Sequence, residues 1–432
     1  MAALSQARAE APPAPERPTP PRKMKLEDCV ATALRQNPDV VSSDEDVKIA
    51  EAKRTEVRGT MGPRVHVDAY AQQWDRPFII QFGPSSFRAR EPFTWNFTAS
   101  MIQPVTALFA IYQQYKVQDL GVDVATVQRE ATRRDTAFHV VEEYYRLLQA
   151  ERLSEVAVAS VDQLEGQLRQ ANSFHENGVV SQNDVLRAQL AVAGAKQRLI
   201  QSRAQVTLAR AELAVTMGMF PDAPIEVEPL AEDPTPKNDL SIEQAQQRAL
   251  AGRVEVQELD RRIEQASRGV SGAWMRLAPQ VNLVGSYIHN EGSQFAQMDS
   301  AYVGATASWD VWDWGTTTGG ISEARAKARQ ALTARARVDD EVRLEITHAY
   351  LGVGTATEAL TVAKTAVVQA EENYRLVSKR YEANAATSFD VVDAEGLLTQ
   401  ARGQLQTSVY DYMVARAALL RAMGDPAAKA AP

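Results

Sequence analysis

The chain has 432 residues, 24% of them charged, and a formal net charge of -8. A negative balance without a basic cluster argues against nucleic acid as a partner. The single cysteine, Cys29, cannot form an internal disulfide, and because no stretch reaches about 18 consecutive apolar residues, no transmembrane helix is expected.

The N-terminal part begins with a segment rich in proline and alanine, residues 1–23, which predicts a disordered tail. A helical pattern follows from Leu26 to about Thr60. It is interrupted at Asn37-Pro38, because a proline disfavours helix in the residue before it. A similar helical segment begins again at Ile242.

The period of the apolar residues then changes from that of a helix to two. Apolar and polar residues alternate in two runs within residues 64–103 and again in two runs within residues 280–313. Each run has about 10 residues, the length of a tilted membrane-spanning strand. The pattern predicts one β-hairpin in each region, four strands in total, with a long loop at about residues 75–92.

All six tryptophans lie in or beside these hairpins. Tryptophan favours the membrane–water boundary, where both its apolar ring and its N–H are accommodated. A soluble antiparallel sheet with one buried face would show the same alternation, and alternation alone favours that alternative. The aromatic residues expected at a membrane interface are Trp74, Phe93, Trp95, Phe97, Tyr287, Tyr302, Trp309 and Trp312.

Two very long helical segments follow the hairpins, from about Leu108 to His175 and from about Ile321 to Tyr381, both without proline. Helices of this length are expected to pack along neighbours in a coiled bundle. Each ends in a tip, at residues 175–184 and 381–390, where glycine or asparagine tolerates left-handed backbone. Each tip leads into a helix with a capping signature at its start.

These last two helices show the same heptad pattern. In the second, large residues recur every seventh position from Val391 to Leu419, beside a seam of small residues from Ala394 to Ala422. The first helix, from Val185, keeps the same register about 206 residues earlier. An internal duplication is therefore predicted. Its parts are a first repeat at 24–218, a linker at 219–240, a second repeat at 241–424 and a C-terminal tail at 425–432.

This order resembles the TolC-like outer-membrane efflux channel family over nearly all of residues 24–424. The matching segments are Leu26 to Leu34 with Asn37-Pro38, Gly178-Val-Val-Ser-Gln-Asn-Asp-Val-Leu186, Asp313-Trp314-Gly315, and Tyr381 through Asp390-Val-Val-Asp393-Ala394. The resemblance implies a mainly α fold with a membrane β-barrel part. Long duplicated coiled-coil helices would form an α-barrel, and four strands per protomer would build a twelve-stranded barrel in a homotrimer.

The resemblance also implies a place in the outer membrane of a Gram-negative bacterium, in contact with lipid and extending into the periplasm. Its implied partners are a periplasmic adaptor and an inner-membrane pump of RND or ABC type. The implied role is a passive exit duct for tripartite efflux or type I secretion.

Several site residues follow from the resemblance alone. Asp390 and Asp393 match aspartates that narrow a closed pore, although Asp390 is equally well explained as a helix cap. Tyr381 and Asp184 match a hydrogen-bonded pair that locks the gate, and Ala386 stands where some members carry an arginine. The tip residues expected to contact the adaptor are Gly178, Val179, Val180, Ser181, Asn384, Ala385, Ala386 and Thr387.

No enzymatic motif is found in the sequence. The five histidines form no metal-ligand pattern, and there is no phosphate-binding glycine loop or nucleophile motif, so no cofactor is expected. The alternative of a different class is a soluble coiled-coil scaffold with a small β-domain. The ten-residue hairpins with their tryptophans favour the channel.

Overall fold

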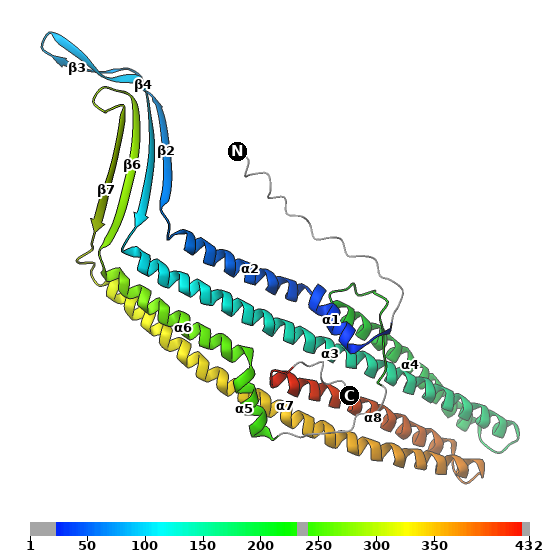
Figure 1. The fold of residues 1–432 in the computed structure, drawn as a ribbon. Coiled ribbons are helices and arrows are strands. Elements are labelled where there is room, and N and C mark those ends of the chain that lie inside the picture. The colour runs from blue at the N-terminus through cyan, green and yellow to red at the C-terminus, as the bar shows by residue number, and fades with distance from the viewer. Residues whose placement is uncertain (1–22, 231–240, 426–432) are drawn as a thin grey trace. The chain divides into compact units, whose positions relative to one another are not determined.

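A computed structural model describes residues 23–230 and 241–425 of the chain (Figure 1). The tail before residue 23, the end of the linker at 231–240 and the tail at 426–432 lie outside the described residues. Among the helices that the structure describes, none combines the length and the apolar character needed to cross a membrane.

The described chain is mainly helical, which confirms the predicted fold class for the protomer. The interruption predicted at Asn37-Pro38 separates the first two helices, and both capping signatures begin helices. The helices are α1 (Leu26–Gln36), α2 (Pro38–Gly59), α3 (Ala107–Glu176), α4 (Gln182–Thr216), α5 (Ile242–Gly252), α6 (Val254–Trp274), α7 (Thr316–Glu382) and α8 (Ser388–Ala422).

The chain divides into two compact units that do not coincide with the sequence repeats. One unit takes residues 42–132 and 250–344, which include the sheet, and the other takes the remainder, which includes both helix tips. Each unit therefore draws on both repeats. The two repeats themselves remain a prediction from the sequence.

The sheet of the first unit contains the four long strands that the alternation predicts. They are β2 (Arg64–Gln73), β4 (Ser85–Pro104), β6 (Gln280–Ser293) and β7 (Asp299–Ser308), in the order β2-β4-β6-β7 with antiparallel neighbours. Both predicted hairpins are present, and the pairing of β4 with β6 joins them into one sheet (Figure 1).

A fifth strand lies where the sequence predicted a long loop. Strand β3 (Phe78–Phe82) pairs with the first part of β4, so residues 78–90 form a short hairpin of their own. Gly83 makes its turn with φ of 60°, a left-handed conformation that glycine adopts at little cost. The loop prediction was wrong because the adjacent apolar residues Phe78, Ile79 and Ile80 hide a period of two.

A second small ladder lies in the other unit. Strand β1 (Lys23–Met24) runs parallel to β5 (Glu226–Val227), a pair that the sequence analysis did not predict. Two-residue strands carry too little pattern to be read from the sequence.

One face of the sheet is apolar and open in the protomer. Register pairs such as Ala71 with Trp95 and Leu283 with Ala305 share a face, since paired residues of neighbouring strands point the same way. On the edge strands, Val65 is 67% exposed and Val303 is 89% exposed. The protomer alone leaves this face uncovered.

Four helical segments of the sheet-bearing unit lie side by side (Figure 1). Arg54 of α2 pairs with Asp119 of α3 at 3.4 Å. The side-chain amide of Gln265 in α6 donates to the Val117 carbonyl of α3 at 2.9 Å. Arg335 of α7 pairs with an aspartate of α6 at 3.0 Å. The order across this layer is therefore α2, α3, α6, α7.

The heptad helices use their predicted seams for packing. Val192 and Ala195 of α4 form a buried cluster with Val161 and Leu164 of α3. The second heptad helix, α8, buries more of its surface than α4 does, including bulky residues such as Tyr412. The two copies of one sequence pattern thus occupy different environments.

Candidate functional site at the helix tips

The first tip is a tight turn between α3 and α4. Gly178 has φ of 71°, and the Val180 carbonyl lies 3.0 Å from Nδ1 of His175. Ser181 then caps α4. Its main-chain N–H and its hydroxyl both donate to Oδ2 of Asp184, at 3.1 and 2.6 Å. This reciprocal capping box satisfies N–H groups that a helix start leaves free.

The second tip, between α7 and α8, has the same construction. Asn384 adopts a φ of 56°, and the Ala385 N–H donates to the Arg380 carbonyl at 2.7 Å. Thr387 caps α8, and its main-chain N–H and hydroxyl donate to Oδ2 of Asp390 at 2.7 and 2.8 Å. The left-handed residues and the caps are those expected from the sequence.

The two predicted gate carboxylates have different surroundings. The hydrogen bonds from the main chain and hydroxyl of Thr387, aided by the charge of Arg380, hold the pKa of Asp390 below its usual value. Asp393 is exposed, and among residues 23–230 and 241–425 it has no hydrogen-bond or ion-pair partner. The Asp390 carboxylate is therefore engaged in the cap, while the Asp393 carboxylate is open to solvent.

The predicted lock between Tyr381 and Asp184 is not formed as a hydrogen bond in the protomer. Tyr381 is 2% exposed and its ring lies 5.5 Å from that of Phe174. Burial, then the nearby charge of Asp184, raises the pKa of the phenol. Its hydroxyl faces that of Ser388 without hydrogen-bond geometry. The Asp184 carboxylate accepts hydrogen bonds from Ser181 instead. The lock therefore remains a prediction.

Two features of this region were not predicted. The Arg187 guanidinium of α4 lies 5.6 Å from the Phe389 ring of α8 and links the two tips. The exposed aromatic inside the second capping box was the available signal. Glu395 of α8 is 2% exposed and accepts hydrogen bonds from the hydroxyls of Ser160 at 2.6 Å and Thr399 at 2.7 Å.

The predicted interface aromatics gather on the sheet and at its ends. Phe93, Trp95, Phe97 and Tyr287 share the apolar face, whereas Tyr302 lies on the opposite face. Several rings have polar partners within the sheet. The Tyr287 hydroxyl donates to Asp299 at 2.5 Å, and the Trp95 N–H donates to Glu291.

The remaining tryptophans lie where strands meet turns or helices. The Trp74 N–H donates to Thr94 at 3.1 Å, and an arginine lies 3.6 Å over its ring. Trp309 and Trp312 follow the end of β7, and both are exposed. The Trp309 N–H donates to the Leu277 carbonyl at 3.1 Å. Trp309 and Trp312 thus lie at the helix-side end of the sheet, and Trp74 lies at the end of β2 away from α2.

Within the part of the chain that the structure describes, no group of three or more His, Cys, Asp or Glu side chains is placed to hold a metal ion. The arrangement offers instead a sheet with an apolar face, long helices and a pair of acidic tips.

Known proteins share this architecture. The family model described as outer membrane efflux protein matches residues 29–219 and 245–425. The solved CmeC outer membrane channel of Campylobacter jejuni superposes with a TM-score of 0.81 at 13% identity, over 92% of this chain and 85% of that chain. At that identity the likeness concerns the fold.

Two relatives found by sequence similarity are also named as outer membrane proteins. The outer membrane efflux protein BepC of Brucella suis is 23% identical over 303 residues, which is 69% of this chain and 65% of BepC. The outer membrane protein OprJ of Pseudomonas aeruginosa is 33% identical over 111 residues, 26% of this chain and 21% of OprJ. The chain thus spans just under two thirds of BepC and about a fifth of OprJ.

Proposed function

Because the chain belongs to the outer membrane efflux protein family, we propose that it is the exit duct of a tripartite efflux or type I secretion system. Members of this family are outer-membrane channels rather than enzymes, as expected from the sequence. The duct would conduct substrates passively from an inner-membrane pump and its periplasmic adaptor to the outside. The pump would be of RND or ABC type.

The observation that carries the proposal is the open sheet. Edge strands β2 and β7 each have one neighbour among the described strands, and the apolar face is exposed. Lipid does not tolerate unpaired strand edges. Three copies would pair β2 of one protomer with β7 of the next and close a twelve-stranded barrel. The apolar face would then meet lipid, and the long helices would continue the duct.

The tips support an electrostatic gate. Threefold symmetry would repeat Asp390 and Asp393 into a ring of six carboxylates, which favours cations. Asp390 already accepts two hydrogen bonds from Thr387. Asp393 is therefore the residue on which selectivity should mainly depend.

The test is single-channel conductance of the purified protein in a planar bilayer. Asp393→Asn should reduce cation selectivity, and Asp390→Asn should reduce it less while loosening the α8 cap. Asp340→Asn changes an exposed aspartate on α7 in the sheet-bearing unit and is the matched control. Equal cation selectivity in all variants would contradict the proposed gate but not the proposed duct. A protein that stays soluble without detergent and never conducts would favour the coiled-coil scaffold.

A further inference from the structure

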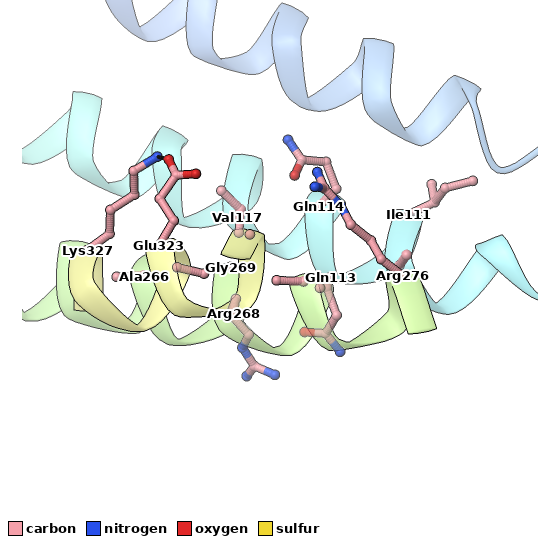
Figure 2. A pocket seen from close by; sticks show the side chains of 15 residues that line it. Ile111, Gln113, Gln114, Val117, Ala266, Arg268, Gly269, Arg276, Glu323 and Lys327 are labelled. Atoms are coloured by element: carbon pink, nitrogen blue, oxygen red, sulfur yellow. Dashed lines mark ion pairs between the residues drawn. The ribbon is translucent and has the colours of Figure 1, made fainter. Parts of the chain in front are cut away.

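A cavity of about 600 Å³ lies in the sheet-bearing unit between α3, α6 and α7. Small residues leave the space. Gly269 and Ala266 of α6 line it (Figure 2). Gly320, near the start of α7, also lines it. A side chain built at Gly269 would meet no atom within 4 Å. The volume is in the range of ligand sites, about 300–1,000 Å³.

Polar side chains gather on one side of this cavity. In Figure 2 Arg276, Gln114, Glu323 and Lys327 point the same way, with the Arg276 guanidinium toward Gln114. Lys327 pairs with Glu323 at 2.6 Å, and this bond holds the pKa of Glu323 below its usual value. Among the described residues, Arg276 has no ion-pair partner within 4.0 Å. This side of the cavity therefore carries one uncompensated positive charge.

One end of the cavity, at Arg276 and Ala110, lies within about two helical turns of the strand ends. Strand β4 ends at Pro104, β6 begins at Gln280, and β7 ends at Ser308, while the cavity is lined by residues 110–117, 266–276 and 320–327. Tryptophans accompany it. Trp274 ends α6, with the Arg325 guanidinium 5.1 Å from its ring, and Trp314 is 89% exposed. Such rings favour a membrane–water boundary.

We propose that this cavity binds the phosphodiester headgroup of an anionic phospholipid in the periplasmic leaflet of the outer membrane. The proposal rests on the proposed function, which puts the strand ends at that boundary. A guanidinium matches two phosphate oxygens with two parallel N–H donors. Arg276 supplies this fork, and the Gln114 amide and the Lys327 ammonium supply further donors.

The single uncompensated charge favours a headgroup with one net negative charge. Phosphatidylglycerol has that charge, and its glycerol hydroxyls offer donors that the Glu323 carboxylate accepts. Phosphatidylcholine has no net charge and no such donor. The cavity should therefore discriminate between these two lipids by headgroup, although their acyl chains are the same.

Two variants remove the site by different means. Arg276→Gln removes the charge that faces the phosphate. Gly269→Leu fills the cavity, and because a Cβ at this position meets no neighbour, the helix should form normally. The matched controls are Arg261→Gln, an exposed arginine earlier on α6, and Gly352→Leu, a helical position that is also open on all sides but lies in α7 outside the cavity.

The measurement is native mass spectrometry of the detergent-purified protein titrated with either lipid. Wild type should bind phosphatidylglycerol more tightly than phosphatidylcholine. Arg276→Gln should weaken the binding of phosphatidylglycerol by roughly tenfold or more, the usual effect of losing a charge-assisted contact. Gly269→Leu should weaken this binding by a similar factor, because the leucine side chain occupies the site. Both controls should bind as wild type does.

Equal binding of the two lipids by wild type, or equal binding by Arg276→Gln and Arg261→Gln, would overturn the site. Conductance of the same preparations separates this failure from failure of the proposed function. A protein that conducts but shows no headgroup preference would contradict only the proposed lipid site. A protein that neither inserts into bilayers nor conducts would contradict both the lipid site and the proposed function.

Discussion

The buried Glu395 of α8 gives the sharpest test of how the helices near the tips hold together. Its carboxyl group accepts hydrogen bonds from Ser160 of α3 and Thr399 of α8 at 2.6 and 2.7 Å. Ser160, like Glu395, is 2% exposed. A buried polar group is tolerated when it is hydrogen-bonded and costly when its partner is removed.

Glu395→Ala removes the acceptor and leaves the Ser160 hydroxyl without a partner. An orphaned buried donor costs about 1–3 kcal/mol, and the lost side-chain volume adds a cavity cost of on the order of 1 kcal/mol. We expect a total loss of roughly 2–4 kcal/mol in the free energy of unfolding. The double change Ser160→Ala/Glu395→Leu removes both members of the buried Ser160–Glu395 pair and leaves only the half-buried Thr399 hydroxyl of this cluster. It should lose much less stability, because apolar replacement of a buried polar pair is often nearly neutral.

The assay is the midpoint of heat unfolding in detergent, followed by far-ultraviolet circular dichroism at a fixed scan rate. The rate is fixed because unfolding of such proteins is often irreversible. Glu395→Ala should lower the midpoint by roughly 5 °C. Glu358→Ala, an exposed position on α7, is the control. A double variant as unstable as Glu395→Ala would refute the reasoning, since the loss would not then come from the orphaned hydroxyl.

Three further outcomes are expected. Gly218→Ala should lower the free energy of unfolding by more than about 1 kcal/mol, because φ is 78° and a Cβ would lie 2.5 Å from a main-chain oxygen of α1. Its control, Gly252→Ala, has open space around the Cβ and should be nearly neutral in the same melting assay. Cys29 should resist thiol reagents until the protein unfolds, because burial raises its pKa to about 12 and the thiolate is the reactive form; labelling of the native protein at neutral pH would contradict this. The cap formed by Asp390 should stabilise α8 above the unfolded pKa of about 3.9 and be lost as pH falls through the lowered folded value, so Thr387→Ala should flatten that acid dependence of the melting midpoint.

The sequence predicted the tips best because their determinants are local. A capping box needs two residues three positions apart, and Ser181 with Asp184 satisfies it in the structure. The left-handed turns at Gly178 and Asn384 likewise depend on residue type at one position. The four long strands were predicted because their alternation is sustained over many residues.

What the sequence missed depends on tertiary placement. Strand β3 is defined by its pairing with β4. Glu395 lies in the same register position as Gln189 of α4, which is exposed, so the heptad pattern alone gave no reason to expect a buried carboxyl group. For the predicted Tyr381–Asp184 hydrogen bond, local structure competes with the tertiary contact. The Asp184 carboxylate accepts hydrogen bonds from the neighbouring Ser181 rather than from Tyr381.

The β3–β4 hairpin has a practical consequence for work on living cells. It extends the sheet at the end away from the helices (Figure 1), and its turn at Gly83 has no atom within 4 Å of a notional side chain. In a cell that places the sheet in its outer membrane, this turn is the part of the chain that antibodies and bacteriophages would meet first. It is therefore the natural position at which to insert a peptide tag for counting assembled copies on intact bacteria.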